Sequence, residues 1–177
     1  MPNTAVGIII LANIFFQIPM STAAIAAKVT LKISSPVFEH EGHIPKKYTC
    51  DGKNINPPLL INGIPDEAVS LVLIIEDPDA PGNIFDHWVV WNIPPVETIE
   101  EASLPGMVGK NSEGKNIYMG PCPPSGTHRY FFKVYALDTV LDIDDDSDKK
   151  IIEQALLNHV LAYGELMGMY KNKAENN

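Results

Sequence analysis

The chain has 177 residues, of which 45% are hydrophobic and 20% charged, and this is enough for one domain with its own core. Its 22 acidic residues outnumber its 13 basic residues, so the formal charge is −9 and the basic surface that nucleic acid requires is missing. The same charge predicts repulsion from anionic membranes but allows a local anion pocket, because net charge does not set local potential.

The first 27 residues resemble a secretory signal peptide. No charged side chain precedes Lys28, and an apolar run at 5–18 leads into small residues, with Ala24 and Ala26 in the small-x-small pattern of cleavage after Ala26. We expect export to the periplasm or medium, with no membrane span after removal of the leader. An uncleaved anchor and a misassigned start are the alternatives, and the second would leave the protein in the cytoplasm. Residues 28–177 are expected to form a single domain.

Hydrophobic patterning predicts a series of strands along this domain. Residues 29–33 alternate apolar with polar side chains, which is typical of a half-buried strand. Residues 37–62 are rich in turn formers and predict loops with short extended pieces. Residues 69–75 are almost wholly apolar and predict a strand buried on both faces. Residues 87–93 and 129–137 predict two further strands.

The remaining segments predict one long loop region and one helix. Residues 94–127 contain many prolines and glycines, so we expect a functional loop or short strands there. An acidic patch at 142–148 precedes the helix, which Asp146 or Ser147 would cap, and apolar residues at 151–160 lie on one helical face. The patch lacks the calcium-loop glycine and glutamate spacing, so capping is the favoured interpretation. The pattern predicts a mainly β domain, a sandwich with helix near the C-terminus.

Two cysteines, Cys50 and Cys122, leave two alternatives open. In an exported protein an even count favours one disulfide, which would stabilise the fold by roughly 4 kcal/mol through closure of a long loop. Two buried free thiols are the alternative, because sequence does not establish proximity. Two cysteines at this separation are no zinc signature.

Three polar clusters follow or precede the strand-like runs. They are Asp77-Pro78-Asp79-Ala80-Pro81, Asp86-His87, and Gly120-Pro121-Cys122-Pro123-Pro124 leading into Thr127-His128-Arg129-Tyr130. Prolines restrict the backbone around Asp77 and Asp79 and present these carboxylates rigidly. If the strand ends meet at one rim of the sandwich, His87, His128 and Asp77 converge there.

Strand periodicity separates the residues around His128. Tyr130 lies two residues beyond His128 and therefore on the same face, whereas Arg129 points to the opposite face. Arg129 is the only arginine of the chain. We expect it to be buried and paired with a carboxylate rather than with a ligand held by His128.

Four interpretations compete for these clusters. A hydrolase would need a nucleophile, but Ser125 and Thr127 make no triad with their sequence neighbour His128, and no Gly-x-Ser-x-Gly elbow occurs. A metal site could use His87, His128 and Asp77, although no reinforcing ligand motif accompanies them. A structural hydrogen-bond network and a pocket for a phosphate or carboxylate remain.

The clusters resemble the phosphatidylethanolamine-binding protein (PEBP) family, and within it the bacterial and archaeal Raf-kinase-inhibitor-like branch. The resemblance covers residues 29–170 in order. Its motifs are the 77–81 and 120–130 clusters, His87-Trp88-Val89-Val90-Trp91-Asn92-Ile93-Pro94, Tyr48-Thr49-Cys50-Asp51-Gly52-Lys53-Asn54 and the tail Leu166-Met167-Gly168-Met169-Tyr170.

The resemblance implies a PEBP-like β-sandwich with a large antiparallel sheet and short C-terminal helices. It also implies a small anion pocket for phosphorylated head groups such as phosphoethanolamine. Carried over by position, the ligand-binding residues are Asp77, Pro81, His87, Gly120, Pro121, His128 and Tyr130.

The family carries no established reaction, so the resemblance implies a binding protein rather than an enzyme, with no cofactor and no metal. The expected partner is a small ligand bearing a phosphate or carboxylate, held by the pocket imidazoles and by backbone N–H groups of the Gly120 loop. Some relatives inhibit serine proteases and eukaryotic relatives regulate kinases, so a protein-interaction module acting on a protein target is the alternative. Four features depart from the family: Leu60-Ile61 stand where an aromatic is common, Asn56 stands where this branch often has serine, the lid helix of animal relatives has no matching motif, and the signal-like leader is not general to the family.

Overall fold

The computed structural model describes residues 29–171, and the predicted leader at 1–27 lies outside them. Within the described residues, no helix is long and apolar enough to cross a membrane.

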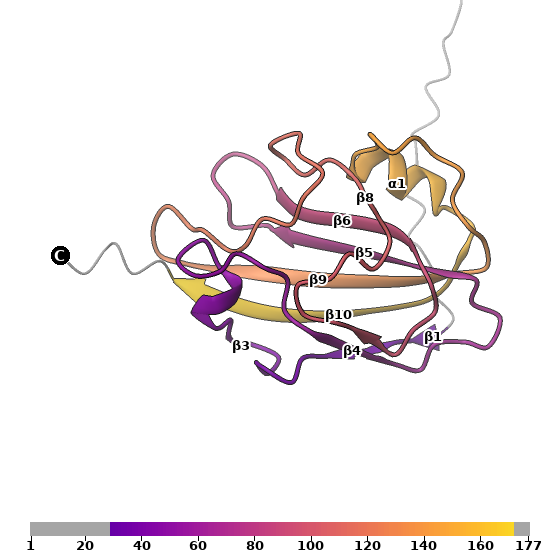
Figure 1. Ribbon diagram of the computed structural model, residues 1–177, viewed down its shortest axis with the longest axis horizontal. Coiled ribbons are helices and arrows are strands. Elements are labelled where there is room, and N and C mark those ends of the chain that lie inside the picture. The colour runs from indigo at the N-terminus through magenta and orange to yellow at the C-terminus, as the bar shows by residue number, and fades with distance from the viewer. Residues whose placement is uncertain (1–28, 172–177) are drawn as a thin grey trace, which may run out of the picture.

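The described chain is built mainly from strands (Figure 1). In order, the elements are β1 (Val29–Thr30), β2 (Lys32–Ser34), β3 (Gly42–His43), the 3-10 helix η1 (Lys46–Tyr48), β4 (Leu59–Asn62), β5 (Ser70–Asp77), β6 (Phe85–Ile93), β7 (Thr98–Ile99), β8 (Met107–Val108), β9 (Thr127–Leu137), α1 (Lys149–Ala155) and β10 (Val160–Lys171).

The strands form two sheets. The larger sheet has the order β1-β10-β9-β5-β6-β8, with β3 also paired to β10, and the smaller sheet has the order β2-β4-β7. The long central strands are antiparallel, while β1 and β3 run parallel to β10. The predicted mainly β sandwich with a large antiparallel sheet is therefore confirmed.

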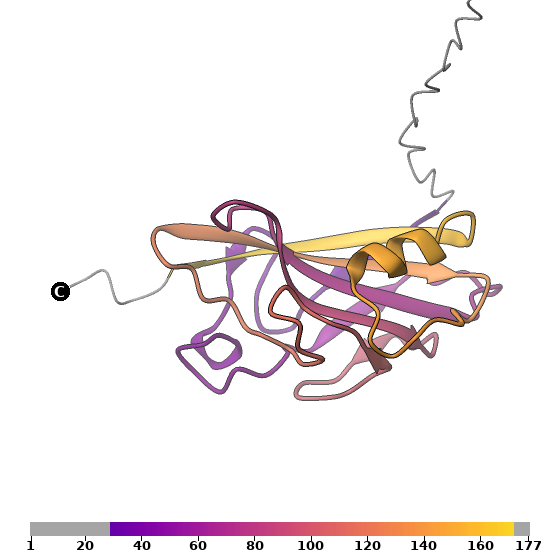
Figure 2. The ribbon, with the colours of Figure 1, turned by 90° about the horizontal axis from the view of Figure 1, so that it is seen from above.

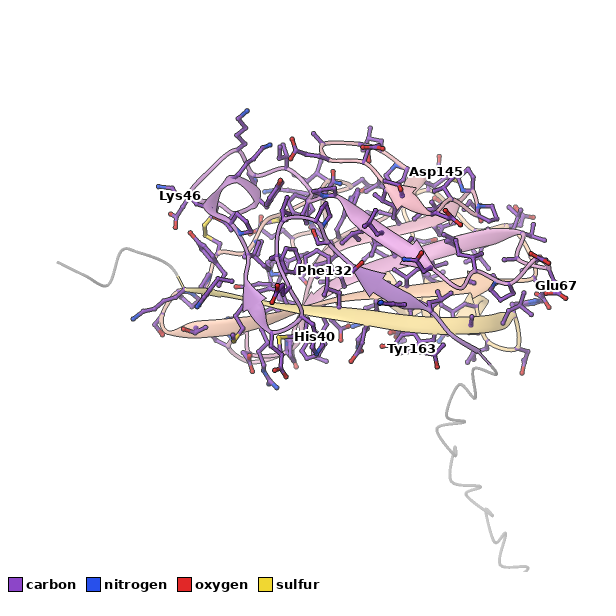
Figure 3. The ribbon with its side chains drawn as sticks, turned by 90° about the horizontal axis from the view of Figure 1, so that it is seen from below. His40, Lys46, Glu67, Phe132, Asp145 and Tyr163 are labelled. Carbon is purple, nitrogen blue, oxygen red and sulfur yellow. A yellow bond between two sulfur atoms is a disulfide. The ribbon has the colours of Figure 1, made fainter. Side chains whose placement is uncertain are left out.

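The larger sheet has an apolar layer on each face. On one face it packs against the smaller sheet, and Phe132 lies in this main core (Figure 3). On the other face, α1 lies over part of the sheet (Figure 2). Ile152 and Leu156 from this region belong to the apolar layer there. Strand β5 is buried along its whole length, because its side chains point alternately into the two apolar layers, starting with Leu71 in one layer and Val72 in the other.

Two boundaries near the ends of the domain differ from the predictions. The predicted strand at 29–33 is divided into β1 and β2, which belong to different sheets. The helix is capped by Asp148, whose carboxylate accepts from Ile151 N–H, so the predicted caps at Asp146 and Ser147 are wrong.

The helical face predicted to reach residue 160 ends at Ala155, and only this one α-helix occurs in the described C-terminal part. Strand β10 follows it and pairs with β9 along most of its length. A glycine is required at Gly164, because a Cβ there would lie 2.2 Å from the Leu31 carbonyl oxygen. Long-range pairing with β9 therefore decides the structure of this segment.

Candidate functional site

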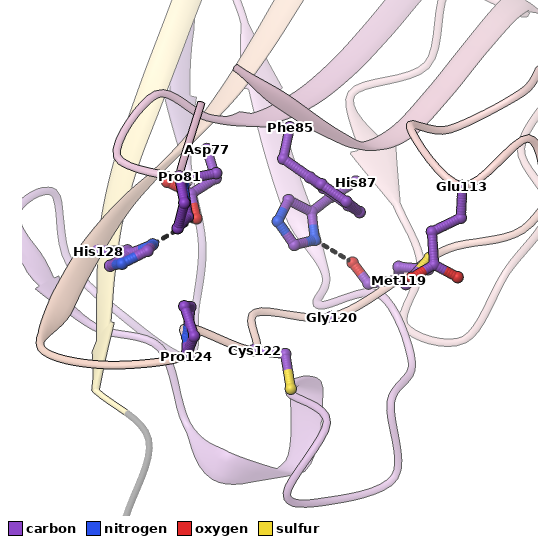
Figure 4. A pocket seen from close by; sticks show the side chains of 11 residues that line it. Asp77, Pro81, Phe85, His87, Glu113, Met119, Gly120, Cys122, Pro124 and His128 are labelled. Carbon is purple, nitrogen blue, oxygen red and sulfur yellow. Dashed lines mark hydrogen bonds and ion pairs between the residues drawn. The ribbon is translucent and has the colours of Figure 1, made fainter. Parts of the chain in front are cut away.

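A cavity of about 320 Å³ lies at one end of the larger sheet (Figure 4). Strand β5 ends there, and its antiparallel neighbours β6 and β9 begin there, so the three strands deliver their terminal side chains to one rim. The lining residues are Asp77, Ala80, Pro81, Phe85, His87, Glu113, Met119, Gly120, Cys122, Pro124 and His128.

Asp77 and His128 form a buried pair in this cavity. The Asp77 Oδ2 atom lies 2.7 Å from His128 Nδ1, and its Oδ1 atom accepts a 2.8 Å hydrogen bond from Asp79 N–H. Because an ionised carboxylate only accepts hydrogen bonds, the proton on the His128 ring is held at Nδ1. The Nε2 atom is therefore the ring nitrogen that remains for a ligand.

His87 is anchored in a similar way. Its Nδ1 lies 2.8 Å from the Met119 carbonyl oxygen, which can only accept, so Nδ1 carries the proton here too. Burial lowers the pKa of His87, and this outweighs the opposite effects of the Met119 carbonyl and the Asp77 charge. The ring contacts Phe85, with centroids 4.8 Å apart, and the neutral ring presents the lone pair of Nε2.

Five of the seven predicted site residues line the cavity, and two lie behind it. The Tyr130 ring packs edge-on against His87 at 5.2 Å. Its buried hydroxyl makes no hydrogen bond of good geometry among the described residues, although Asp77 and the Cys122 backbone lie close enough to act on its pKa. Burial raises the pKa of this hydroxyl, and the negative charge of Asp77 raises it further. Pro121 is buried, and its carbonyl accepts a hydrogen bond from Cys50 N–H at 3.1 Å.

The pocket wall, residues 120–124, is held by a neighbouring loop, residues 45–54. Gly120 N–H donates to Asn54 Oδ1 at 2.7 Å, so this donor of the loop is engaged within the protein. Gly120 must be a glycine, because a Cβ would lie 2.4 Å from the Tyr48 carbonyl oxygen. Cys50 and Cys122 form a disulfide with Cα atoms 5.4 Å apart, which decides between the two alternatives left open by the sequence.

Arg129 lies outside the cavity. It pairs with Asp79 through its Nη2 at 2.7 Å and its Nε at 2.9 Å, and its backbone N–H also donates to that carboxylate. The hydrogen bonds from Arg129 lower the pKa of Asp79 to about 2. The predicted pairing with a carboxylate is confirmed, but the arginine is exposed rather than buried.

Six lining residues are not among the predicted ligand-binding residues, although three of them lie in the predicted polar clusters: Ala80, Phe85, Glu113, Met119, Cys122 and Pro124. The position of Phe85 in the lining could have been predicted, since it lies two residues before His87 and therefore on the same strand face. That of Glu113 could not, because the long loop that brings it to the rim carries no periodicity. Among residues 29–171, no group of three His, Cys, Asp or Glu side chains is placed to hold a metal ion.

Comparison with known proteins identifies the family of this fold and pocket. The family model described as phosphatidylethanolamine-binding protein matches residues 34–171. The chain belongs to the phosphatidylethanolamine-binding protein family. Its curated relatives include a UPF0098 protein of the archaeon Methanothermobacter thermautotrophicus, which is 46% identical over 149 residues and aligns with 80% of this chain and 99% of its own length.

Two solved structures share the PEBP fold. CT736 of Chlamydia trachomatis, described as a PEBP homolog, superimposes with a TM-score of 0.79 at 40% identity, covering 81% of this chain and 99% of that one. YbcL of E. coli, described as a new member of the mammalian PEBP family, has a TM-score of 0.74 at 27% identity, with 82% and 100% covered.

Proposed function

We propose that the cavity binds a small anion, a phosphate or carboxylate such as the phosphoethanolamine head group, and does not transform it. The observation that carries the proposal is the common anchoring of two imidazoles. His87 and His128 each use Nδ1 inside the protein and leave Nε2 for a ligand in the same cavity. Phosphate and carboxylate oxygens accept strongly from protonated imidazoles.

Protonation of the pocket is part of this proposal. The wall offers few other donors, because Gly120 N–H is engaged and its three prolines, Pro121, Pro123 and Pro124, have no N–H. Neutral His87 presents a lone pair, and the anion would have to draw a proton onto the ring. Since the pKa of His87 is lowered in the free protein, affinity is expected to rise as pH falls through the imidazole range.

Asp77 supports the imidazoles. Both of its oxygens are engaged, one by His128 and one by Asp79 N–H. It would keep the His128 ring in one tautomer and stabilise the imidazolium when the anion binds. A cationic amine on the ligand would find its negative charge nearby.

Calorimetric titration with phosphoethanolamine tests the proposal. We expect tighter binding at about pH 5.5 than at about pH 7.5, together with proton uptake when two buffers of different ionisation enthalpy are compared. Undetectable binding at both pH values would contradict the proposal.

Three substitutions of one type sharpen the test. His87→Asn keeps a side-chain donor near the Met119 carbonyl and removes Nε2, and His128→Asn does the same beside Asp77. His159→Asn is the matched control, because His159 forms a similar 2.7 Å contact with Asp138 on the exposed surface. The first two should weaken binding and the control should not; unchanged binding in the double pocket variant rejects the proposal.

Export of the mature domain is proposed alongside binding, since an exposed disulfide is compatible with an oxidising compartment. The second candidate function is a protein-interaction module, such as a protease inhibitor. It is favoured by four exposed apolar side chains in the long 94–127 segment, of which Leu104 at 79% and Ile117 at 51% are the most exposed. Inhibition of a serine-protease panel should then survive loss of both pocket histidines.

A further inference from the structure

We propose that the Cys50–Cys122 disulfide is a redox-sensitive clamp on the pocket, so that its reduction weakens anion binding. This inference rests on the proposed function and adds a regulation of the same site. It depends on three features of the disulfide: its position in the cavity, its role in holding the wall, and its exposure.

The disulfide joins a lining residue to a segment that does not line the cavity. Cys122 is part of the lining and Cys50 is not, and no other residue of the 45–54 loop is. The bond therefore acts from behind the pocket wall.

Three hydrogen bonds join the 45–54 loop to the wall or to the segment just before it, and all three involve residues that precede Cys122. Tyr118 hydroxyl donates to the Tyr48 carbonyl at 2.8 Å, Gly120 N–H donates to Asn54, and Cys50 N–H donates to the Pro121 carbonyl. After Cys122 the chain passes through Pro123 and Pro124, which have no N–H, before it enters β9 at Thr127. Among the contacts given for the described residues, the disulfide is the attachment to the 45–54 loop that lies nearest in sequence to Pro124, which also lines the cavity.

The bond is accessible to reductants. Both Cys50 and Cys122 are exposed, and exposed disulfides are the ones that exchange readily with thiols. A dithiol reductant attacks one sulfur as its thiolate and forms a mixed disulfide while the other cysteine leaves as a thiolate. Its second thiol then releases the first cysteine, so two protein thiols and one oxidised dithiol result.

Reduction is expected to loosen residues 122–124 and not the sheet. The main core contains neither cysteine, and His87, His128 and Asp77 are held by strands β5, β6 and β9. If the freed wall occupies its binding position about one tenth of the time, the apparent affinity falls about tenfold.

The experiment compares phosphoethanolamine affinity of the oxidised protein, of the same protein reduced with a dithiol, and of the protein reoxidised afterwards. We expect about tenfold weaker binding on reduction and full recovery on reoxidation. Far-UV circular dichroism and a thermal melt of each form monitor the fold. A reduced protein that keeps its fold and its affinity overturns the proposal.

The control is the double variant Cys50→Ser with Cys122→Ser, whose affinity should match that of the reduced protein and should not respond to the reductant. If this variant fails to fold, the reversible cycle of the natural protein still decides. Backbone NMR signals of Ser125 and Gly126, which directly follow the wall, separate the two proposals when they are recorded in both redox forms without ligand. A redox-dependent shift of these signals without any phosphoethanolamine binding rejects the anion ligand but keeps the clamp, and binding with no redox response rejects the clamp alone.

Discussion

Two adjacent residues at the end of β5 place carboxylates on opposite faces of the larger sheet, and their surroundings differ. Glu76 points to the face that carries α1, where Lys149 lies 2.6 Å away and Lys133 also bonds it. Asp77 points into the cavity, where His128 is its partner. On the first face the carboxylate of Glu76 pairs with two lysines, and on the other face the carboxylate of Asp77 pairs with a histidine ring beside the cavity.

The electrostatic consequences follow from these partners. Burial alone would raise the pKa of Glu76, but the hydrogen bonds from Lys133 and Lys149 outweigh it, and the pKa is lowered. A hollow of about 280 Å³ beside Glu76 has four charged side chains in its lining. Three of them form ion pairs, Glu76 with Lys133 and Arg129 with Asp79, and the fourth, Glu165, accepts a hydrogen bond from the Tyr163 hydroxyl. A closed ion network mainly stabilises structure, whereas the Asp77–His128 pair borders a cavity in which a ligand is proposed to bind.

The largest effect is expected from breaking the closed network. Glu76→Gln leaves two partly buried lysines without their shared anion and should lower the free energy of unfolding by about 2 kcal/mol at neutral pH. Because the pKa of Glu76 is lowered on folding, its contribution is present above the ordinary value near 4.5 and is lost as pH falls through the folded value. Urea denaturation across this range measures both, and phosphoethanolamine binding should not change.

Glu165→Gln is the matched control for that variant, because Glu165 lies on the same face and is exposed. It should cost only a fraction as much. If both variants lose the same free energy of unfolding, the two lysine partners of Glu76 do not make it more stabilising than an exposed glutamate.

The next largest effect is expected from changing Asp77, the carboxylate that points into the cavity. Asp77→Asn keeps an oxygen that can accept from His128 Nδ1–H but removes the charge that stabilises the imidazolium. Anion affinity should fall about tenfold, or about 1.4 kcal/mol, with a smaller change in unfolding free energy. Calorimetry and urea denaturation of the same preparation compare the two quantities, and a stability loss larger than the binding loss would make Asp77 primarily structural.

The smallest effect is expected from weakening the exposed ion pair between Arg129 and Asp79. Arg129→Lys keeps a positive charge but loses the two-pronged contact with Asp79, and the free energy of unfolding should change little because the pair is exposed. The pKa of Asp79 should rise from about 2 toward its ordinary value, which carbon-detected NMR titration measures. If the pKa of Asp79 stays near 2 in this variant, the two side-chain hydrogen bonds from Arg129 are not the cause of its lowered value.

Local sequence signals predicted the central strands well, because β5, β6 and β9 carry strong apolar or β-branched runs. They failed for β10, whose glycines and methionines have weak strand preference and whose structure depends on pairing with β9. The opposed directions of His128 and Arg129 followed from strand periodicity alone. The engagement of Gly120 N–H by Asn54 could not be predicted, because the two residues are 66 positions apart.

The sequence by itself determined the family, the buried strand at 69–75 and the residue types of the pocket, because these depend on local patterns of polarity and on motifs read in order. The tertiary structure alone decided that Cys50 bonds Cys122, that Asp77 pairs with His128 and that Glu76 pairs with two lysines. The physical reason is that each of these contacts joins residues more than fifty positions apart, and only the packing of the sheet brings them within bonding distance. The three polar clusters are thereby resolved into one cavity with two anchored imidazoles, one ion pair outside it and a disulfide behind its wall.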